Sequence, residues 1–362
     1  MKTSKLIYGT LLCLLVAASS CSPKKDSGKQ IRLNDIQTIG SHNSYKQRID
    51  RPLWEMIYQQ DSALAISLDY NHIPIVDQLK LGLRSLELDV FHDPAGGRYA
   101  NPIGLQLQQA QGITPPAFDT DNRLKEPGLK MFHIQDIDFR SHHVLFKDAL
   151  EALKTWSASN PNHMPVIITM NTKSQVIDQP GFTKPLPFTK TALDSIDMEI
   201  TDVLGNDMLI TPDMVRGDSK TLENAILTKG WPKLKKMQGR FMFILDETGQ
   251  KLADYIQGHE SLKGRVMFVR APVGTPEAAV HILNDPIGSQ QEIKSLVQKG
   301  YIVRTRADEG SMEARNNDYS RLNAAISSGA QVISTDYYIP DETLGTTYKA
   351  VLNDKGEYFR IK

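Results

Sequence analysis

The stretch "VDQLKLGLRSLELDV", residues 76–90, joins a helical pattern to a strand pattern through one glycine. Apolar residues recur at helical spacing up to Leu81, whereas residues 84–90 alternate between apolar and polar side chains. These two periods are those of a helix and of a strand. Gly82 lies between them, where a glycine in the left-handed conformation commonly ends a helix. The stretch therefore predicts a helix that turns directly into a strand.

The same order of helix, glycine and strand occurs twice more near the C-terminus. "IKSLVQKGYIVRTR" (293–306) has Gly300 between its two halves, and "RLNAAISSGAQVISTDYY" (321–338) has Gly329. Units of this kind in series are typical of parallel β/α architecture. Further strands are predicted from short apolar runs at residues 36–40, 129–133, 165–170, 240–245 and 265–269.

With the strands expected at 84–90, 301–305 and 332–335, the total is eight. The sequence therefore predicts an α/β fold, a single (β/α)8 TIM-type barrel that is either regular or distorted. A doubly wound open sheet is the alternative, but no glycine-rich phosphate loop follows the first strand. Residues 143–156 carry apolar side chains at helical spacing and predict a helix that packs on the core.

Two long stretches without a regular pattern, residues 94–127 and 174–190, each follow the carboxyl end of a predicted strand. Loops of this length in a compact domain are usually functional or disordered. In parallel barrels the active site lies on the face formed by the carboxyl ends of the strands. This is the face on which we expect the functional site.

The N-terminus predicts a secretory leader. Two lysines precede an apolar stretch, residues 6–18, that is too short to span a membrane. The small residues before Cys21 resemble a bacterial lipobox, which implies a lipoprotein signal peptide over residues 1–20 and lipidation of Cys21. Ordinary cleavage nearby is the alternative. Residues 21–31 would be a lipidated tether, and residues 32–362 a single catalytic domain.

Charge and cysteine content exclude several classes of protein. Lys and Arg number 42, and so do Asp and Glu, so no nucleic-acid footprint is indicated. Removal of residues 1–20 takes away two lysines, so the net charge of the mature protein would be 40 − 42 = −2. The two cysteines are Cys13, inside the leader, and Cys21, at its end. The mature domain therefore has neither a disulfide nor a thiol nucleophile.

Two carboxylates share one face of the strand at residues 84–90. Glu87 and Asp89 are roughly 7 Å apart by strand rise, and the apolar side chains point the opposite way. In a barrel the apolar set meets the helices, so both acids would face the lumen. Two buried anions require a cation, which could be an arginine, a lysine, or a hard metal ion such as Ca²⁺ or Mg²⁺. A solvent-facing edge strand is the alternative.

Histidines stand at or near the ends of predicted strands. His42 closes the first strand, His133 closes the run at 129–133, and His92 follows the strand at 84–90. A single histidine in such a place is more often structural. Two of them beside a strand with paired carboxylates suggest general acid–base catalysis, because imidazoles exchange protons near neutral pH.

Four motifs in order along the chain resemble those of the phosphatidylinositol-specific phospholipase C superfamily. They are "GSHNSY" (40–45), "LELDV" (86–90), "HIQDID" (133–138) and "ISTDYY" (333–338). The resemblance runs from about residue 32 to the C-terminus, and within the superfamily it is to the bacterial calcium-dependent branch. It implies a TIM-barrel phosphodiesterase, here as a lipoprotein.

The resemblance implies a role for each matching residue. His42 and His133 match the two catalytic histidines. Asn43 matches a Ca²⁺ ligand beside the first histidine. Glu87 and Asp89 match the two metal carboxylates, which implies Ca²⁺ as the cofactor.

One position departs from the family pattern. The family's fourth strand typically supplies a further carboxylate, where this chain has Asn171 in "ITMNTKS" (168–174). An amide oxygen can ligate Ca²⁺ but carries no charge, so the affinity would fall. Three alternatives stay open: Asn171 is a ligand of a weakly held metal, Asp136 or Asp138 takes its place, or the metal is absent.

Four residues are candidates for binding the substrate. Arg304 and Arg306 lie two apart on one face of a predicted strand, and guanidinium groups suit a phosphodiester. Structural pairing with acids such as Glu87 is the alternative. Lys173 either reaches the substrate phosphate or is a surface lysine. By analogy with bacterial relatives, Asp336 orients an imidazole or binds an inositol hydroxyl.

The reaction that the resemblance implies is cleavage of a phosphatidylinositol-type lipid by internal attack. His42 would accept the proton of the inositol 2-hydroxyl, and His133 would donate a proton to the departing lipid alkoxide, with help from Ca²⁺. The products would be a cyclic inositol phosphate and diacylglycerol. The expected partners are this lipid and, through the anchor, a membrane. Nucleic acid is not expected, and the chain is expected to be a monomer in the bacterial cell envelope, anchored to the outer membrane and facing the periplasm or the surface.

Two other functions stay open. A glycerophosphodiester phosphodiesterase shares the barrel and the paired carboxylates, but usually has arginine and glycine where this chain has Asn43 and Ser44. A catalytically silent lipoprotein that binds lipid or phosphate is favoured by the lost carboxylate. The presence of two histidines argues against it, because a binding protein needs no proton-transfer groups.

Overall fold

The strands of the protein form one sheet that is almost entirely parallel. The computed structural model describes residues 30–362. Within them the strands are β1 (Ile36–Ser41), β2 (Ser85–Val90), β3 (Val166–Thr172), β4 (Phe241–Leu245), β5 (Phe268–Val269), β6 (Val280–Ile282), β7 (Ile302–Arg306), β8 (Val332–Thr335) and β9 (Phe359–Ile361). Eight are hydrogen-bonded in the order β5-β4-β3-β2-β1-β8-β7-β6, and β9 pairs antiparallel with β1.

The eight parallel strands form a nearly closed barrel. Between β5 and β6, at the two ends of the hydrogen-bonded path, one isolated parallel bridge joins Arg270 to Val280. Each strand lies beside its neighbours in the chain, and β1 lies beside β8, as a (β/α)8 barrel requires. The shortness of β5 and β6 makes the ring irregular on that side. The predicted TIM-type barrel is confirmed in its distorted form.

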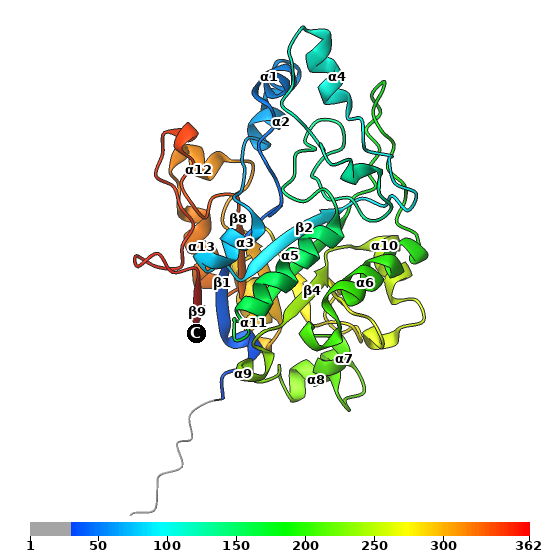
Figure 1. Cartoon of the computed structure of the whole chain (residues 1–362). Helices are drawn as coiled ribbons and strands as arrows, with labels where there is room; N and C mark the ends of the chain where they lie inside the picture. Colours follow the sequence, from blue (N-terminus) through cyan, green and yellow to red (C-terminus); the bar gives the residue numbers. More distant parts are fainter. Residues whose placement is uncertain (1–29) are drawn as a thin grey trace, which may run out of the picture. The chain divides into compact units, whose positions relative to one another are not determined.

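Helices surround the sheet (Figure 1). They are α1 (Arg51–Gln60), α2 (Ser62–Ser67), α3 (Ile75–Leu81), α4 (Ile103–Ala110), α5 (Phe146–Ser159), α6 (Lys190–Leu204), α7 (Pro212–Arg216), α8 (Leu222–Thr228), α9 (Leu234–Met237), α10 (Gly249–Ile256), α11 (Gln290–Lys299), α12 (Met312–Asn316) and α13 (Ser320–Ser328). Short 3-10 turns are η1 (Leu33–Asp35), η2 (Arg123–Lys125), η3 (Asn206–Met208), η4 (Glu260–Leu262) and η5 (Glu342–Leu344).

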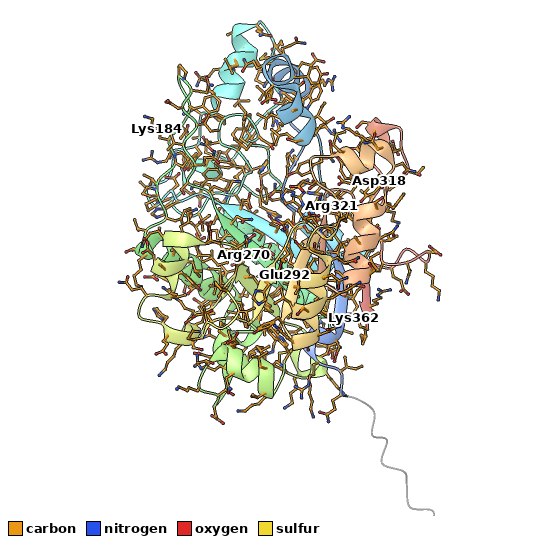
Figure 2. The ribbon with its side chains drawn as sticks, turned by 180° about the vertical axis from the view of Figure 1, so that it is seen from behind. Lys184, Arg270, Glu292, Asp318, Arg321 and Lys362 are labelled. Atoms are coloured by element: carbon orange, nitrogen blue, oxygen red, sulfur yellow. The ribbon has the colours of Figure 1, made fainter. Side chains whose placement is uncertain are left out.

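The helices pack on the barrel through the apolar stripes expected from the sequence. In α5, Ala149, Leu153 and Trp156 recur at helical spacing and are buried in the main core. Charged side chains such as Arg270, Glu292 and Asp318 lie on the outer surface (Figure 2). The barrel is therefore apolar between strands and helices and polar outside.

The three predicted helix–glycine–strand units are present. Gly82, Gly300 and Gly329 follow α3, α11 and α13 with φ of 110°, 103° and 81°. Only glycine adopts this left-handed conformation without steric cost, so each glycine ends its helix and turns the chain toward the next strand.

The strand predicted at residues 129–133 is wrong. Lys130 makes only isolated antiparallel bridges to Phe91 and Leu145, and β2 pairs directly with β3. The segment is buried like a strand of the barrel, with residues 129–132 all inaccessible, but it lies on the excursion between β2 and α5 rather than in the ring. The eighth strand is instead β6, whose three residues Val280–Ile282 are too few for a clear pattern.

An additional layer lies beyond the carboxyl ends of the strands. It consists of α1, α2 and α4, grouped together at the top of Figure 1, and of the long loops. The stretch at 94–127, expected to be irregular, contains α4 and η2, whereas residues 174–189 contain no helix. This layer covers part of the face on which the site was predicted.

The barrel unit spans Ile31–Lys362. The predicted signal peptide (1–20), the lipidation site Cys21 and nearly all of the tether (21–31) lie outside the described residues. Within residues 30–362, no helix is both long and apolar enough to cross a lipid bilayer.

Candidate active site

The carboxyl ends of β1 and β8 bring an imidazole onto a buried carboxylate. His42 directly follows β1, and Asp336 follows β8, its neighbour in the sheet. His42 Nδ1 lies 2.8 Å from Asp336 Oδ1, and Arg306 on β7 lies 3.2 Å from Oδ2. Burial alone would raise the pKa of Asp336, but His42 and Arg306 bring it down to about 2. The ionised carboxylate therefore orients the ring, and Nε2 lies on the side of Glu87, 3.7 Å from Oε1.

A second imidazole is held in the same way by a different part of the chain. His133 Nδ1 lies 2.8 Å from Asp138 Oδ2, within the tight turn formed by "HIQDID". Asp138 Oδ1 lies 3.2 Å from Lys46 Nζ, and neither of these two side chains is exposed. Burial lowers the pKa of His133, and the hydrogen bond to Asp138 offsets this only in part. His133 is therefore mostly neutral at pH 7 in the free protein.

The paired carboxylates of β2 are buried and face the site. Glu87 is 5% exposed and Asp89 is 2% exposed. Glu87 Oε2 forms an ion pair with Arg304 on β7, and Asp89 Oδ2 lies 3.1 Å from Lys173 Nζ, just after β3. Burial alone would raise the pKa of Asp89, but the Lys173 ammonium and both imidazoles hold it below its usual value. The cations that the buried acids require are thus present in the protein itself.

Asn43 is fixed by its backbone and by two tyrosines. Its φ of 47° lies in the left-handed region, which asparagine tolerates better than most residues. Its Nδ2 donates to Tyr70 Oη at 2.7 Å, and Tyr45 Oη donates to its Oδ1 at 3.4 Å. The amide is therefore rigidly placed beside His42.

The residues expected to bind a metal fit Ca²⁺ in the chemical type of their donors. Two carboxylates and two amides form an oxygen set of the kind that Ca²⁺ takes. Asn171 Nδ2 lies 2.9 Å from Glu87 Oε1 and 3.1 Å from Asp89 Oδ1, so one oxygen of each acid points to the same place. Within residues 30–362, no three His, Cys, Asp or Glu side chains group so as to hold a metal. A bound cation would therefore depend on the amides and compete with Lys173 and Arg304.

Asp136 and Asp138, which could have replaced the carboxylate missing at Asn171, do not line the polar cavity at the carboxyl ends of the strands. Asp136 accepts hydrogen bonds from the backbone N–H groups of Ile103, at 2.9 Å, and Thr183, at 2.6 Å. Asp138 is bound to His133 and Lys46. Both carboxylates are therefore committed to other partners.

Arg304 and Arg306 form ion pairs with buried acids and also face the cavity, which are the two alternatives that the sequence left open. Arg304 pairs with Glu87 and donates to Asn284 Oδ1 at 2.6 Å, while Arg306 pairs with Asp336. Both also line the cavity at the carboxyl ends of the strands. Structural pairing and contact with a ligand are therefore compatible for these side chains. Lys173 lines the same cavity, with 29% of its side chain exposed.

Most of these side chains line one polar cavity of about 470 Å³. The polar cavity is lined by His42, Asn43, Glu87, Asp89, His133, Asn171, Thr172, Lys173, Ser174, Gln175, Asp246, Glu247, Lys251, Asn284, Arg304 and Arg306. Asp336, expected to orient an imidazole or bind substrate, does not line this cavity but lies directly behind His42. The structure thus brings together candidates from five of the strands.

Several residues of the site were not expected from the sequence. Asp246 and Glu247 follow β4 in "FMFILDE", and the rule that barrel sites lie at strand ends would have identified them. Asn284 follows β6, the strand that was missed. Lys46 and Tyr70 carry no sequence signal for their roles, because their partners lie far away in the chain.

The comparisons with known proteins agree with this architecture. A family model described as phosphoinositide phospholipase C, Ca²⁺-dependent, matches residues 31–362. No curated protein sequence matches the chain. The protein is similar in fold to a calcium-dependent phosphoinositol-specific phospholipase C of a Gram-negative Pseudomonas species in its myo-inositol complex. The TM-score is 0.54 at 14% identity, over 92% of this chain and 96% of that chain.

It is also similar in fold to a Ca²⁺-dependent phosphatidylinositol-specific phospholipase C from Streptomyces antibioticus. There the TM-score is 0.53 at 14% identity, over 88% of this chain and 97% of that chain. At this identity the likeness shows the fold alone, whereas the family model covers the whole barrel unit. The chain therefore belongs to the Ca²⁺-dependent phosphoinositide phospholipase C family of phosphodiesterases.

Proposed function

We propose that this protein cleaves phosphatidylinositol-type lipids into a cyclic inositol phosphate and diacylglycerol. The observation that carries the proposal is the pair of imidazoles on one cavity, each bound through Nδ1 to a buried carboxylate. An arrangement of this kind leaves both Nε2 atoms free to exchange protons with a substrate. Membership of the family supports the same reaction class.

His42 is the proposed base in the first step. With the Nδ1 proton directed at Asp336, its Nε2 carries a lone pair that accepts the proton of the inositol 2-hydroxyl. The hydroxyl oxygen then attacks phosphorus and forms the cyclic phosphate. Asp336 stabilises the imidazolium that results, because it remains an anion.

His133 is the proposed acid. Its protonated ring donates the Nε2 proton to the lipid alkoxide as the bond from phosphorus to that oxygen breaks, and Asp138 stabilises the charged ring before transfer. Its lowered pKa makes it a stronger acid, and an anionic phosphodiester bound beside it favours the charged form. In a second pass, water replaces the hydroxyl, the two rings exchange roles, and the cyclic phosphate opens.

Positive side chains around the polar cavity suit the phosphodiester. Arg304, Arg306 and Lys173 are proposed to offset the negative charge that grows on the phosphoryl oxygens. Ca²⁺, held by Asn43, Glu87, Asp89 and Asn171, would acidify the attacking hydroxyl and neutralise charge on phosphorus.

Phosphorus NMR of the products tests the proposal directly. Purified protein is incubated with phosphatidylinositol, with and without Ca²⁺, and we expect the resonance of a cyclic inositol phosphate to appear before that of the ring-opened product. A glycerophosphodiester phosphodiesterase would release a linear phosphomonoester and no cyclic species. A silent binding protein would leave the substrate unchanged.

Replacement of Lys173 by methionine is expected to tighten Ca²⁺ binding about tenfold, because a positive charge 3.1 Å from Asp89 is removed. Calorimetric titration of Ca²⁺ into the protein without substrate measures this independently of turnover. Lys251→Met is the matched control, since Lys251 lines the same cavity but is bound to Glu247. Unchanged or weaker binding by Lys173→Met would show that the metal does not lie at the carboxylate pair.

The membrane anchor stays a prediction from the sequence. We infer that Cys21 is lipidated, that the enzyme is a monomer in the bacterial cell envelope, and that it meets its lipid substrate at a membrane surface. Mass spectrometry of the mature N-terminus would reveal an acylated Cys21, and an unmodified terminus would reject the anchor.

A further inference from the structure

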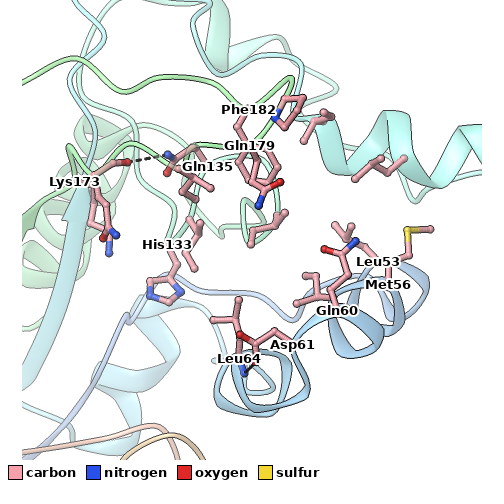
Figure 3. A pocket seen from close by; sticks show the side chains of 18 of the residues that line it. Leu53, Met56, Gln60, Asp61, Leu64, His133, Gln135, Lys173, Gln179 and Phe182 are labelled. Carbon is pink, nitrogen blue, oxygen red and sulfur yellow. Dashed lines mark hydrogen bonds between the residues drawn. The ribbon is translucent and has the colours of Figure 1, made fainter.

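A second, largely apolar cavity adjoins the polar one. Its volume is about 790 Å³, within the range of roughly 300–1,000 Å³ that is usual for small-molecule sites. Figure 3 shows that its walls come from the layer above the barrel, with Leu53 and Met56 on α1, Leu64 on α2, and Phe182 on the loop after β3. We name it the apolar cavity.

The two cavities meet at three residues. His133, Lys173 and Gln175 line both of them. The Nδ1 side of His133 is occupied by Asp138, so the free edge of the ring lies at the junction. The group that receives a proton from His133 must also lie at this junction. In the proposed reaction that group is the oxygen of the lipid alcohol, so the rest of the alcohol extends from that point.

The charges of the site lie on one side of the junction. Glu87, Asp89, Arg304 and Arg306 line the polar cavity only. Among the residues lining the apolar cavity, the charged side chains are Lys173, at the junction, and Asp61, whose carboxylate accepts the backbone N–H of Leu64 at 2.9 Å. A phosphorylated sugar therefore suits the first cavity, and an uncharged hydrocarbon suits the second.

The walls of the apolar cavity are fixed in place. Asp136, which is 3% exposed, accepts the backbone N–H of Ile103 at the start of α4 and that of Thr183 in the loop after β3. α4 also lies directly against α1, because a Cβ added to Gly104 would be 2.6 Å from Leu53 Cδ2. One buried carboxylate thus ties two walls to the turn that carries His133. A preformed cavity binds without a large cost in ordering.

We propose that the apolar cavity is the subsite for the leaving group, and that it takes the acylglycerol part of a single lipid molecule. This inference rests on the proposed function, and it adds that the enzyme recognises the lipid tail as well as the head group. Substrates with short soluble chains are then expected to gain in kcat/KM by roughly fourfold for each methylene that enters the cavity.

Direct binding of dihexanoylglycerol, which has no phosphate, tests the subsite apart from turnover. Titration calorimetry is expected to show binding to the wild-type protein and at least tenfold weaker binding to Leu107→Glu. Leu107, on α4, lines the cavity and is 41% exposed, so a charge there should be compatible with folding. Leu227→Glu is the matched control, because Leu227 on α8 is 49% exposed and does not line the cavity.

The kinetic counterpart compares monomeric dihexanoylphosphatidylinositol with the methyl phosphodiester of inositol. The ratio of their kcat/KM values should exceed tenfold in the wild type and in Leu227→Glu, and should fall toward one in Leu107→Glu. No binding of dihexanoylglycerol, or equal binding by Leu107→Glu, overturns the subsite even where phosphatidylinositol is cleaved. Binding that is lost in Leu107→Glu, together with no cleavage of any substrate, supports an apolar ligand site and rejects the proposed function.

Discussion

Replacement of His133 by alanine is expected to lower kcat/KM for phosphatidylinositol cleavage by about 10²–10⁴-fold, the usual contribution of a placed proton donor. The imidazole lies where both cavities meet, and of the three side chains that line the junction, His133, Lys173 and Gln175, it is the one suited to exchange a proton near neutral pH. His42→Ala should have a similar effect, because the proposed base and the proposed acid would act in one step. For the same reason the double variant should lose little more than either single variant.

The measurement is an initial-rate assay with phosphatidylinositol, combined with circular dichroism to verify folding. His259→Ala is the control, since the ring of this histidine bonds to the backbone carbonyl of Lys263, on the connection between α10 and β5, and does not line either cavity. Its rate should equal that of the wild type. Full activity in a folded His42→Ala or His133→Ala variant would remove these residues from the mechanism.

Replacement of Lys46 by methionine is expected to lower the free energy of unfolding by about 3–5 kcal/mol. The Lys46 ammonium and the Asp138 carboxylate are both fully buried and 3.2 Å apart. Lys46 also donates to the backbone carbonyls of Leu68 and Tyr70, at 3.0 and 2.9 Å. The variant leaves Asp138 with His133 as its remaining ionisable partner, so the pKa of His133 should rise while stability falls.

Urea denaturation of the wild type and of Lys46→Met measures the loss. Lys80→Met breaks a pair with Asp77 whose side chains are 64% and 46% exposed, so it should change stability by about 1 kcal/mol or less. An equal midpoint for Lys46→Met and the wild type would mean that this buried pair contributes nothing. The pKa of His133, followed by proton NMR, gives a second and independent readout.

The barrel could be predicted because its signals are local. Each helix, its terminal glycine and the next strand lie within about 15 residues, and the period of apolar side chains changes at the glycine. The prediction of a strand at residues 129–133 failed for the same reason, since a short buried apolar run resembles a barrel strand even where it makes only isolated bridges. Only the pairing in the folded structure distinguishes a strand of the barrel from a buried segment of this kind. β6 was not predicted, because its three residues, Val280–Ile282, are too few to show the alternation of apolar and polar side chains that marks a strand.

The sequence predicted which residues form the candidate site, but not which side chains bind one another within it. The residues at strand ends, such as His42 and Glu87, could be identified because a parallel barrel collects them on one face. The partner of each side chain could not, because it depends on register and distance in space. Asp138 was considered as a metal ligand, whereas the structure commits it to His133 and Lys46. Asn171 donates its amide to both acids of β2, an arrangement that no spacing along the chain reveals.

The bond between His42 and Asp336 joins residues 294 positions apart in the chain. β1 pairs with β2, but its other hydrogen-bonding neighbours are β8 and β9, far away in the chain. The proposed base and the carboxylate that orients it therefore come together only once β1 has paired with β8. A polypeptide that stops before Asp336 lacks both this carboxylate and the pairing of β1 with β9, so the ring of His42 loses the group that orients it.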